Sequence, residues 1–141
     1  MSHNSSADPA APIRRRRRRG EERRSNCPVA CSLDIVGDRW TLLLVRDLLR
    51  GKARYSDFLA SPERIPTNIL ADRLKRLEQE GLITSVPYSD HPRRMEYRLT
   101  PEGRALGRAV SALANWGLSH FPGTVRPAGF PSPADSASSP S

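Results

Sequence analysis

Two cysteines, Cys27 and Cys31, stand one helical turn apart beside a proline. Pro28 suits the first turn of a helix, which places Cys27 at or near the N-cap of that helix. A helix N-terminus favours the thiolate, and the thiolate is the reactive form of cysteine. Cys27 is therefore a candidate redox-sensing residue. The alternative is a structural cysteine at a subunit contact.

A disulfide between these two cysteines conflicts with the helix that the sequence predicts. Side chains four residues apart on a helix have Cβ atoms about 5–6 Å apart, whereas a disulfide requires about 3.8 Å. An internal bond would require unwinding, so a bond between subunits is the favoured oxidised form. Cys31 is expected to be a small core residue. Two cysteines are too few for a disulfide scaffold, and the expected location is the cytoplasm, where thiols stay reduced.

A second set of chemically useful side chains lies on the outer face of a helix predicted from about residue 67 to 80. Its inner face is defined by apolar residues at helical spacing, namely Ile69, Leu70, Leu74 and Leu77. We expect Thr67, Asn68 and Lys75 to contact DNA, because asparagine pairs with adenine and lysine reaches guanine or phosphate. The competing interpretation is an ordinary solvated helix face.

Three charged residues of the same helix have less direct assignments. Arg73 and Arg76 are candidate DNA contacts, but either can pair with nearby acids instead. Asp72 belongs to the same candidate face, although a carboxylate cannot contact phosphate favourably. We expect Asp72 to orient Arg76, four residues further along the helix.

A basic turn at residues 89–94 separates two stretches in which apolar and polar residues alternate. Adjacent arginines at a hairpin tip suit phosphate binding or insertion into a narrow minor groove, so His91, Arg93 and Arg94 are candidate DNA contacts. The alternative is a polar loop that its charge keeps soluble. Arg54 and Ser56 are further candidates for phosphate, with Ser56 expected at a helix N-terminus.

The elements that must position these residues follow from apolar spacing and capping residues. We predict helices over residues 28–36, 38–51, 56–59, 67–80 and about 101–119. Asp38, Ser56 and Thr100 are the expected N-caps of the second, third and last of these helices. Residues 82–88 and 95–99 alternate in polarity and predict a hairpin. The predicted fold is mainly α with a small β hairpin. This order describes a winged helix-turn-helix, whose second helix of the pair enters the major groove of DNA.

Charge and composition divide the chain into three parts. Its 23 lysines and arginines exceed its 15 acidic residues, for a formal net charge of +8. Residues 1–26 are rich in arginine and residues 122–141 in proline and serine, so we expect two disordered tails. Between them, residues 27–121 are expected to form one DNA-binding and dimerisation domain. No stretch is apolar enough to span a membrane.

The sequence predicts neither a cofactor nor a metal site. Its three histidines are widely separated and have no acidic or cysteine cluster at metal-ligand spacing. No phosphate-loop, dinucleotide or nucleophile motif is present, so we expect a binding protein without catalytic residues. The run from Arg14 to Arg19 has two open interpretations, which are added affinity for phosphates and no fixed role.

From Cys27 to Gly117 the chain resembles the HxlR family of bacterial winged-helix regulators, which are relatives of MarR. The resemblance rests on the stretches CPVACSLDIVGDRWTLLLVRDLL, RYSDF, LADRLKRLEQEGLI, EYRLTPEGRAL and NWG. It implies a homodimeric DNA-binding transcriptional regulator without enzymatic activity, whose first and last helices form the dimer interface. Cys27 matches the N-terminal cysteine that some members use as a sensor. Many members have a serine where this chain has Pro66, and Thr67 is expected to take over the role of that serine as cap or phosphate contact.

Together these features predict a regulator that reads an inverted-repeat operator. The sequence itself does not choose between repression and activation, and the resemblance implies repression, which is the commoner mode in that family. The recognition helices of a dimer would lie in successive major grooves, about 34–36 Å apart, and the wings would contact the flanking backbone. An electrophile or a small molecule acting near the dimer interface is the expected effector. Two alternatives stay open: a non-specific nucleic-acid binder driven by Arg14 to Arg19, and a protein-interaction module that has lost DNA binding.

Overall fold

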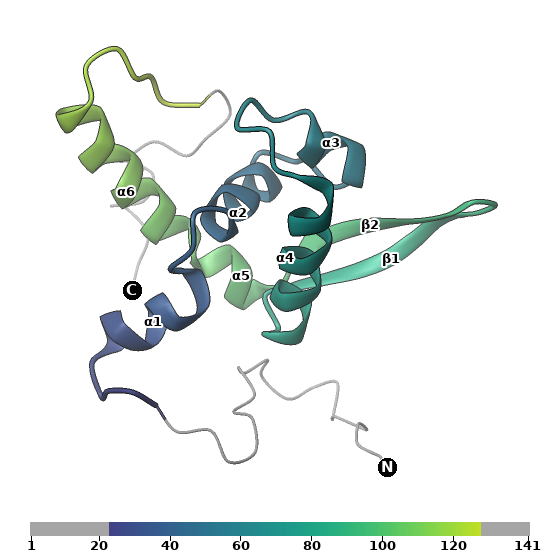
Figure 1. Ribbon diagram of the computed structural model, residues 1–141, viewed down its shortest axis with the longest axis horizontal. Helices are drawn as coiled ribbons and strands as arrows, with labels where there is room; N and C mark the ends of the chain where they lie inside the picture. Colours follow the sequence, from purple (N-terminus) through teal and green to yellow (C-terminus); the bar gives the residue numbers. More distant parts are fainter. Residues whose placement is uncertain (1–22, 128–141) are drawn as a thin grey trace.

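The computed structural model describes residues 23–127, a helical body from which a two-stranded hairpin projects (Figure 1). Its elements in chain order are α1 (Pro28–Val36), α2 (Thr41–Leu49), α3 (Tyr55–Leu59), α4 (Thr67–Gln79), β1 (Ile83–Asp90), β2 (Arg93–Leu99), α5 (Pro101–Ala105) and α6 (Gly107–His120). The run from Arg14 to Arg19 and residues 128–141 lie outside the described residues. None of the described helices has the length and apolar character that crossing a bilayer requires.

The first two helices follow the predicted start and stop residues, with one shift. α1 begins at Pro28 and ends before Gly37, as predicted. α2 begins three residues after Asp38, yet the Asp38 carboxylate accepts hydrogen bonds from the N–H groups of Trp40 and Thr41 at 2.8 and 2.9 Å. Asp38 therefore satisfies N–H groups that the helix itself leaves unpaired.

The prediction that Ser56 caps α3 is wrong. Arg54 is the N-cap residue, and Ser56 lies inside the first turn of the helix. The Asp57 carboxylate accepts hydrogen bonds from the backbone N–H groups of Ala53 and Arg54 at 3.2 and 3.0 Å. A carboxylate that reaches back in this way pairs with the N–H groups at the helix start, and the positive end of the helix dipole stabilises its charge.

α4 agrees with the predicted helix at both ends. Thr67 opens it after Pro66, which is the N-cap. Gly81, just beyond its C-terminus, has a φ angle of 77°, a left-handed conformation that glycine adopts readily. The Leu82 N–H then donates to the Leu77 carbonyl oxygen at 2.9 Å, which closes the helix and directs the chain into β1.

β1 and β2 form an antiparallel hairpin that we call the wing. Asp90 pairs with Arg93 across the strands, so only His91 and Pro92 remain in the connecting turn. The prediction that residues 89–94 form a turn is therefore wrong. The oppositely charged Asp90 and Arg93 face each other across the strands, where a loop was expected. The register shifts around Tyr88, which is the extra residue of a β-bulge, and bulges redirect side chains.

The predicted single helix after the wing is instead two helices, with a break at Leu106. Thr100 caps α5 as predicted, since its hydroxyl accepts a hydrogen bond from the Gly103 N–H at 3.1 Å. The same hydroxyl donates to the Gly81 carbonyl oxygen at 2.7 Å. A Cβ atom at position 103 would overlap the Leu82 carbonyl oxygen, so this close approach requires glycine, at some cost in helix propensity near the break.

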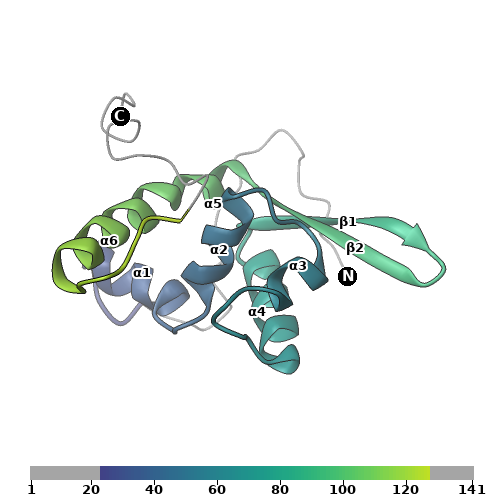
Figure 2. The ribbon, with the colours of Figure 1, turned by 90° about the horizontal axis from the view of Figure 1, so that it is seen from above.

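The hydrophobic core lies where α2, α3, α4 and β1 meet, and α6 adds one side to it. Its residues are Leu44, Val45, Leu48, Phe58, Ile65, Leu70, Leu74, Leu77, Ile83 and Val110. The predicted inner face of α4 is confirmed for its three leucines, whereas Ile69 is only partly buried. In Figure 2, α4 lies below this core, the wing extends to one side, and α1 and α6 lie together at the opposite end.

Candidate nucleic-acid interface

The outer face of α4 presents a polar strip to solvent. Thr67, Asn68, Asp72 and Lys75 are exposed, together with Ala71. Residues three and four apart on a helix are neighbours on its surface, so these five side chains form one continuous strip. The structure thus brings together the residues that the sequence assigned to the DNA-reading face.

Arg73 points away from this strip toward the start of α2. Its Nε atom donates to Asp38 Oδ1 at 3.2 Å, and its Nη1 atom donates to the Asp72 carboxylate. Its side chain is 21% exposed. The predicted pairing of Asp72 with Arg76 is wrong, because the adjacent Arg73 takes the carboxylate while Arg76 is directed inward.

Arg76 reaches from α4 to the C-terminal end of α1. Its Nη2 atom donates to the backbone carbonyl oxygen of Asp34 at 2.5 Å, across 42 residues of sequence. Carbonyl groups near a helix C-terminus carry partial negative charge and favour a guanidinium. Arg73 and Arg76 therefore attach α4 to α2 and α1, and a contact of either residue with DNA stays a prediction.

The tip of the wing carries the predicted basic residues. His91, Arg93 and Arg94 are exposed there. An open cleft of about 410 Å³ lies between the wing and α3, and it is lined by Tyr55, Ser56, Leu59, Tyr88, Arg93, Arg94, Met95 and Tyr97. Ser56 and the two wing arginines therefore line the same cleft, although Ser56 is not a helix cap.

Arg54 has two partners in the structure. Its Nε atom lies 3.3 Å from Glu96 Oε2, and its guanidinium carbon lies 3.8 Å from the centre of the Tyr88 ring. Both partners belong to the wing. Arg54 therefore connects the start of α3 to the wing, and its predicted contact with phosphate stays a prediction.

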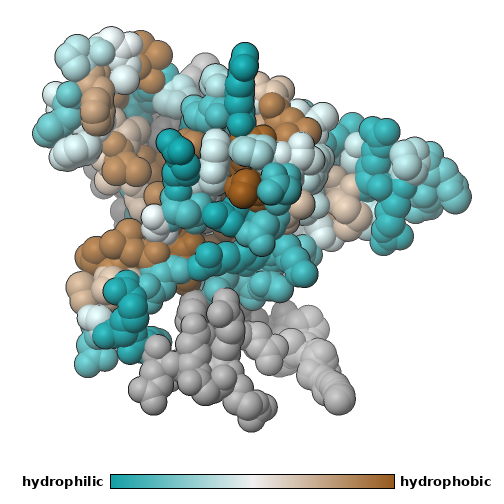
Figure 3. Space-filling view, in the orientation of Figure 1, coloured by the Kyte–Doolittle hydropathy of each residue, from teal (hydrophilic) through white to brown (hydrophobic). Residues whose placement is uncertain are grey.

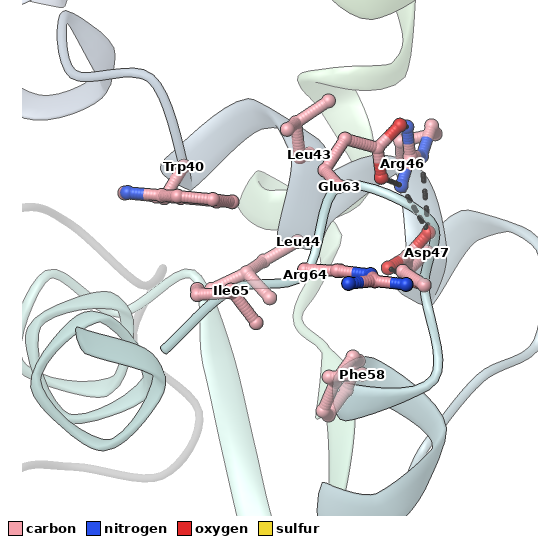
Figure 4. Close-up of a pocket in the computed structure, with 10 residues that line it drawn as sticks. Trp40, Leu43, Leu44, Arg46, Asp47, Phe58, Glu63, Arg64 and Ile65 are labelled. Carbon is pink, nitrogen blue, oxygen red and sulfur yellow. Dashed lines mark hydrogen bonds and ion pairs between the residues drawn. The ribbon is translucent and has the colours of Figure 1, made fainter. Parts of the chain in front are cut away.

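A buried carboxylate of α2, that of Asp47, is the main feature that the sequence analysis missed. Asp47 is 2% exposed, and its Oδ2 atom accepts a hydrogen bond from the Ser61 hydroxyl at 2.6 Å. Its Oδ1 atom lies 2.9 Å from Arg46 Nη2 (Figure 4). Buried charges are usually paired, so a single acid within the apolar run TLLLVRDLL was the signal that could have revealed it.

Arg46 connects this buried carboxylate to the loop between α3 and α4. Its Nη1 and Nη2 atoms donate to the two carboxylate oxygens of Glu63 at 2.9 and 2.8 Å (Figure 4). The hydrogen bonds from Arg46 outweigh burial and hold the pKa of Glu63 below its usual value. Paired bonds of this kind fix orientation as well as distance, so they position the loop from which α4 starts.

Asp38 joins α2 to α4. Burial opposes its ionisation, but hydrogen bonds from the Thr41 hydroxyl, from the N–H groups of Trp40 and Thr41, and from Arg73 outweigh burial and lower its pKa to about 2. The Thr41 hydroxyl donates to Asp38 Oδ2 at 2.5 Å. Asp38 is therefore ionised at neutral pH and holds the start of one helix and the side of another.

A second surface lies at the end of the molecule opposite the wing (Figure 2). Four large apolar side chains of α1 and α6 remain 53–65% exposed, namely Val29, Leu33, Leu113 and Trp116. They line an open groove between the two helices, and apolar surface gathers along the left side of the molecule in Figure 3. Contiguous exposed apolar patches mark interaction surfaces, whereas scattered apolar residues do not.

Cys27 lies beside this apolar groove. It is the N-cap residue of α1, as predicted, and its exposed thiol makes no capping hydrogen bond. The next residue, Pro28, lines the groove. Cys31 is only partly buried, which differs from the predicted core position, because its thiol turns toward the Ser25 carbonyl oxygen and donates to it at 3.3 Å.

These elements define a winged helix-turn-helix protein: α3 and α4 are the helix pair, and the wing follows α4 directly. The chain belongs to the HxlR-like helix-turn-helix family, whose family model matches residues 35–124. The predicted resemblance and fold class are therefore confirmed.

Individual relatives agree with this assignment. The uncharacterised HTH-type transcriptional regulator Rv3095 of Mycobacterium tuberculosis is 44% identical over 103 residues, which are 73% of this chain and 63% of the relative. This chain thus spans less than two thirds of that relative's length. The crystal structure of PA1607 is 38% identical with a TM-score of 0.65, covering 74% of each chain. The oxidised form of the redox regulator HypR is 33% identical with a TM-score of 0.61, covering 66% of this chain and 96% of that chain.

The junction at Asp38 predicts a pH-dependent stability. Asp38→Ala should lower the free energy of unfolding by about 1 kcal/mol at neutral pH, because two N–H groups and Arg73 lose their acceptor. The folded-state pKa of about 2 lies below the ordinary aspartate value of 3.8, so the contribution of the charge is present above about pH 4 and is lost as the pH falls toward 2. Urea unfolding of both proteins at several pH values measures the difference.

The exposed carboxylate Asp90 supplies the control for this measurement. Asp90→Ala should change stability less than Asp38→Ala at neutral pH. A stability difference between wild type and Asp38→Ala that stays constant from pH 7 down to about pH 3 contradicts the assigned role of the charge.

Proposed function

We propose that the protein is a sequence-selective DNA-binding transcriptional regulator, with residues 27–121 as its DNA-binding and dimerisation domain. The observation that carries the proposal is the exposed polar strip of α4 beside a basic wing, in a family whose relatives are described as transcriptional regulators. An α-helix fits the major groove of DNA, which is about 12 Å wide. Repression is the direct outcome of occupying an operator, and it is the mode of action that we propose.

The four polar side chains of the α4 strip each match a group that DNA offers. Asn68 suits adenine, and Lys75 suits guanine or phosphate. Asp72, which Arg73 holds in place, suits the amino group of cytosine. Thr67 stands at the first position of the helix, where N–H groups and the helix dipole favour phosphate.

The wing and α3 complete the proposed contact surface. His91, Arg93, Arg94 and Ser56 are assigned to the sugar-phosphate backbone, where contacts set position without reading sequence. Each neutralised phosphate makes log K fall with log salt concentration by about 0.9. By the same relation, each phosphate contact raises the affinity at 0.15 M salt about fivefold over the affinity at 1 M salt.

Substitutions on α4 and on the wing should therefore have different effects. Duplexes enriched from a random pool by the wild-type chain supply the specific site, and fluorescence anisotropy at fixed salt supplies the affinities. Asn68→Ala should lower the preference for the enriched duplex over unrelated DNA roughly tenfold, within the range for one base contact. Arg93→Ala with Arg94→Ala should weaken both duplexes by about fivefold per arginine and lower the salt slope by about 0.9 each.

Arg104→Ala is the matched control, because Arg104 is an exposed arginine of α5 that belongs neither to the α4 strip nor to the tip of the wing. It should leave preference nearly unchanged. Equal affinity of the wild type for enriched and unrelated duplexes would contradict the proposal. In that case, loss of affinity on deleting residues 1–26 would favour the arginine-driven binder, and absence of any DNA binding would favour the interaction module.

We propose that a second copy of the chain covers the apolar groove of α1 and α6. A two-fold dimer uses the same patch on both subunits, and the exposed Leu33 and Leu113 supply apolar area from both helices of that patch. The two helices that line the groove lie at the end opposite the wing (Figure 2), so a dimer joined there leaves α4 and the wing of each copy free. Two such reading heads explain the proposed inverted-repeat operator.

Placing a charge in this groove should convert the dimer into monomers. Leu33→Glu or Leu113→Glu should halve the mass measured by light scattering and abolish tight binding to a two-half-site duplex, since a buried unpaired carboxylate is costly. Val125→Glu is the matched control, because Val125 is an apolar residue that is 82% exposed and belongs neither to the groove lining nor to the wing. A wild-type chain that is monomeric at concentrations where it binds DNA would refute the dimer.

We also propose that oxidation or alkylation of Cys27 changes DNA affinity. HypR, a relative of known structure, is described as a redox regulator, and the exposed Cys27 precedes the proline that lines the groove. An adduct or an intersubunit disulfide at this position would alter the packing of α1 in the dimer. A small molecule bound near the same interface is the alternative effector.

Paired cysteine variants test this proposal. After treatment with diamide, which oxidises thiols to disulfides, the DNA affinity of the wild type and of Cys31→Ser should change, whereas Cys27→Ser should keep its affinity. The proposal is wrong if Cys27→Ser responds as the wild type does. An unchanged affinity in all three proteins would direct the search to a small-molecule effector.

A further inference from the structure

The orientation of the wing depends on contacts at its base. A two-stranded hairpin by itself is at best marginally stable in water, and within residues 23–127 the sheet contains only β1 and β2. The residues just before α3 supply backbone contacts to β2: the Tyr97 N–H donates to the Ala53 carbonyl oxygen at 2.8 Å, and Arg54 forms an isolated bridge with Glu96. These contacts attach the hairpin at one edge.

The Arg54 side chain extends this attachment to both strands. Its Nε atom donates to Glu96 Oε2 in β2 at 3.3 Å, and its guanidinium carbon lies 3.8 Å from the centre of the Tyr88 ring in β1. Tyr88 is the extra residue of the bulge. A guanidinium is attracted to an aromatic face, and its planar shape allows stacking and an ion pair at the same time.

We infer that Arg54 is a positioning residue that fixes the angle between the wing and α3, and that it is not a phosphate contact. For its effect on DNA binding, this inference rests on the proposed function. Glu96 is the partner through which Arg54 acts. Hydrogen bonds from Arg98 and Arg54 hold the pKa of Glu96 below its usual value, so its carboxylate is charged at neutral pH.

The distance from this contact to the wing tip makes the angle important. Arg93 lies three residues beyond Glu96 along β2, which corresponds to about 10 Å of extended strand. A rotation of the hairpin at Glu96 therefore moves the guanidinium groups of Arg93 and Arg94 away from any fixed phosphate. Arg54 is expected to affect DNA affinity only through these tip residues.

A double-mutant cycle separates positioning from direct contact. In the wild-type background, Arg54→Ala should lower affinity for the enriched duplex by about fivefold, close to the loss of one phosphate contact. In the background of Arg93→Ala with Arg94→Ala, the same change should cost less than about twofold, because the wing has no tip cations left to position. A full fivefold loss in that background, with a salt slope lowered by about 0.9, would establish a direct phosphate contact and overturn the inference.

Glu96→Gln and Arg54→Lys separate positioning from electrostatics, with Arg98→Ala as their control. Glu96→Gln removes a negative charge, so electrostatics alone predicts tighter DNA binding, whereas loss of the partner of Arg54 predicts weaker binding. Arg54→Lys keeps the charge but loses the planar group, and we expect it to bind as weakly as Arg54→Ala. Arg98→Ala is the matched control, since Arg98 also pairs with Glu96 at 3.1 Å but belongs to the wing itself. Tighter binding by Glu96→Gln, or near wild-type binding by Arg54→Lys, would contradict the inference.

Hydrogen exchange of the free full-length chain tests the inference without DNA. Arg54→Ala and Glu96→Gln should both accelerate exchange of wing amides, including that of Tyr97, while amides of α2 and α4 stay protected. Unchanged exchange in the wing would refute the positioning role. A wild-type chain that shows no preference for any duplex would refute the proposed function alone, because the exchange result still decides the role of Arg54.

Discussion

The ion pair between Arg73 and Asp38 fixes the rotation of α4 about its own axis. The proposed DNA-reading surface depends on this rotation. Three buried leucines hold α4 against the core, but apolar attraction has no preferred direction. A charge-assisted hydrogen bond does have one, and the Asp38 carboxylate is itself fixed by N–H groups at the start of α2. Since each residue turns a helix by about 100°, the exposure of Asn68 and Lys75 depends on this anchor.

The cations of the described residues serve two physical purposes. Arg46, Arg54 and Arg73 pair with carboxylates of other elements and join those elements together. The cations of the wing tip and Lys75 of α4, by contrast, extend into solvent where a polyanion can reach them. Affinity for DNA therefore depends on which cations remain exposed, a distinction that the net charge of +8 does not make.

Local signals in the sequence were enough to predict α1 to α4, the hairpin and the exposed strip of α4, but not the break between α5 and α6. Pro28, Gly37 and Gly81 mark boundaries through their own backbone preferences, and the leucine spacing of α4 identifies its inner face. The contacts of Arg54 with Glu96 and of Arg76 with Asp34 could not be predicted in this way, because each pair is separated by 42 residues of sequence. The cap of α3 was misassigned because Asp57 and Ser56 are both capable acceptors, and only the folded chain distinguishes them.

Base-edge readout by α4 in the major groove is the central claim, and purine substitution tests it most directly. Replacing single purines of the enriched duplex by 7-deazapurines removes the N7 acceptor from the major groove while leaving base pairing intact. The account predicts that affinity falls only at a few purines in two clusters, centred about 10 base pairs apart. Equal affinity for every substituted duplex would contradict it, because a protein that ignores N7 throughout its site does not read bases through α4.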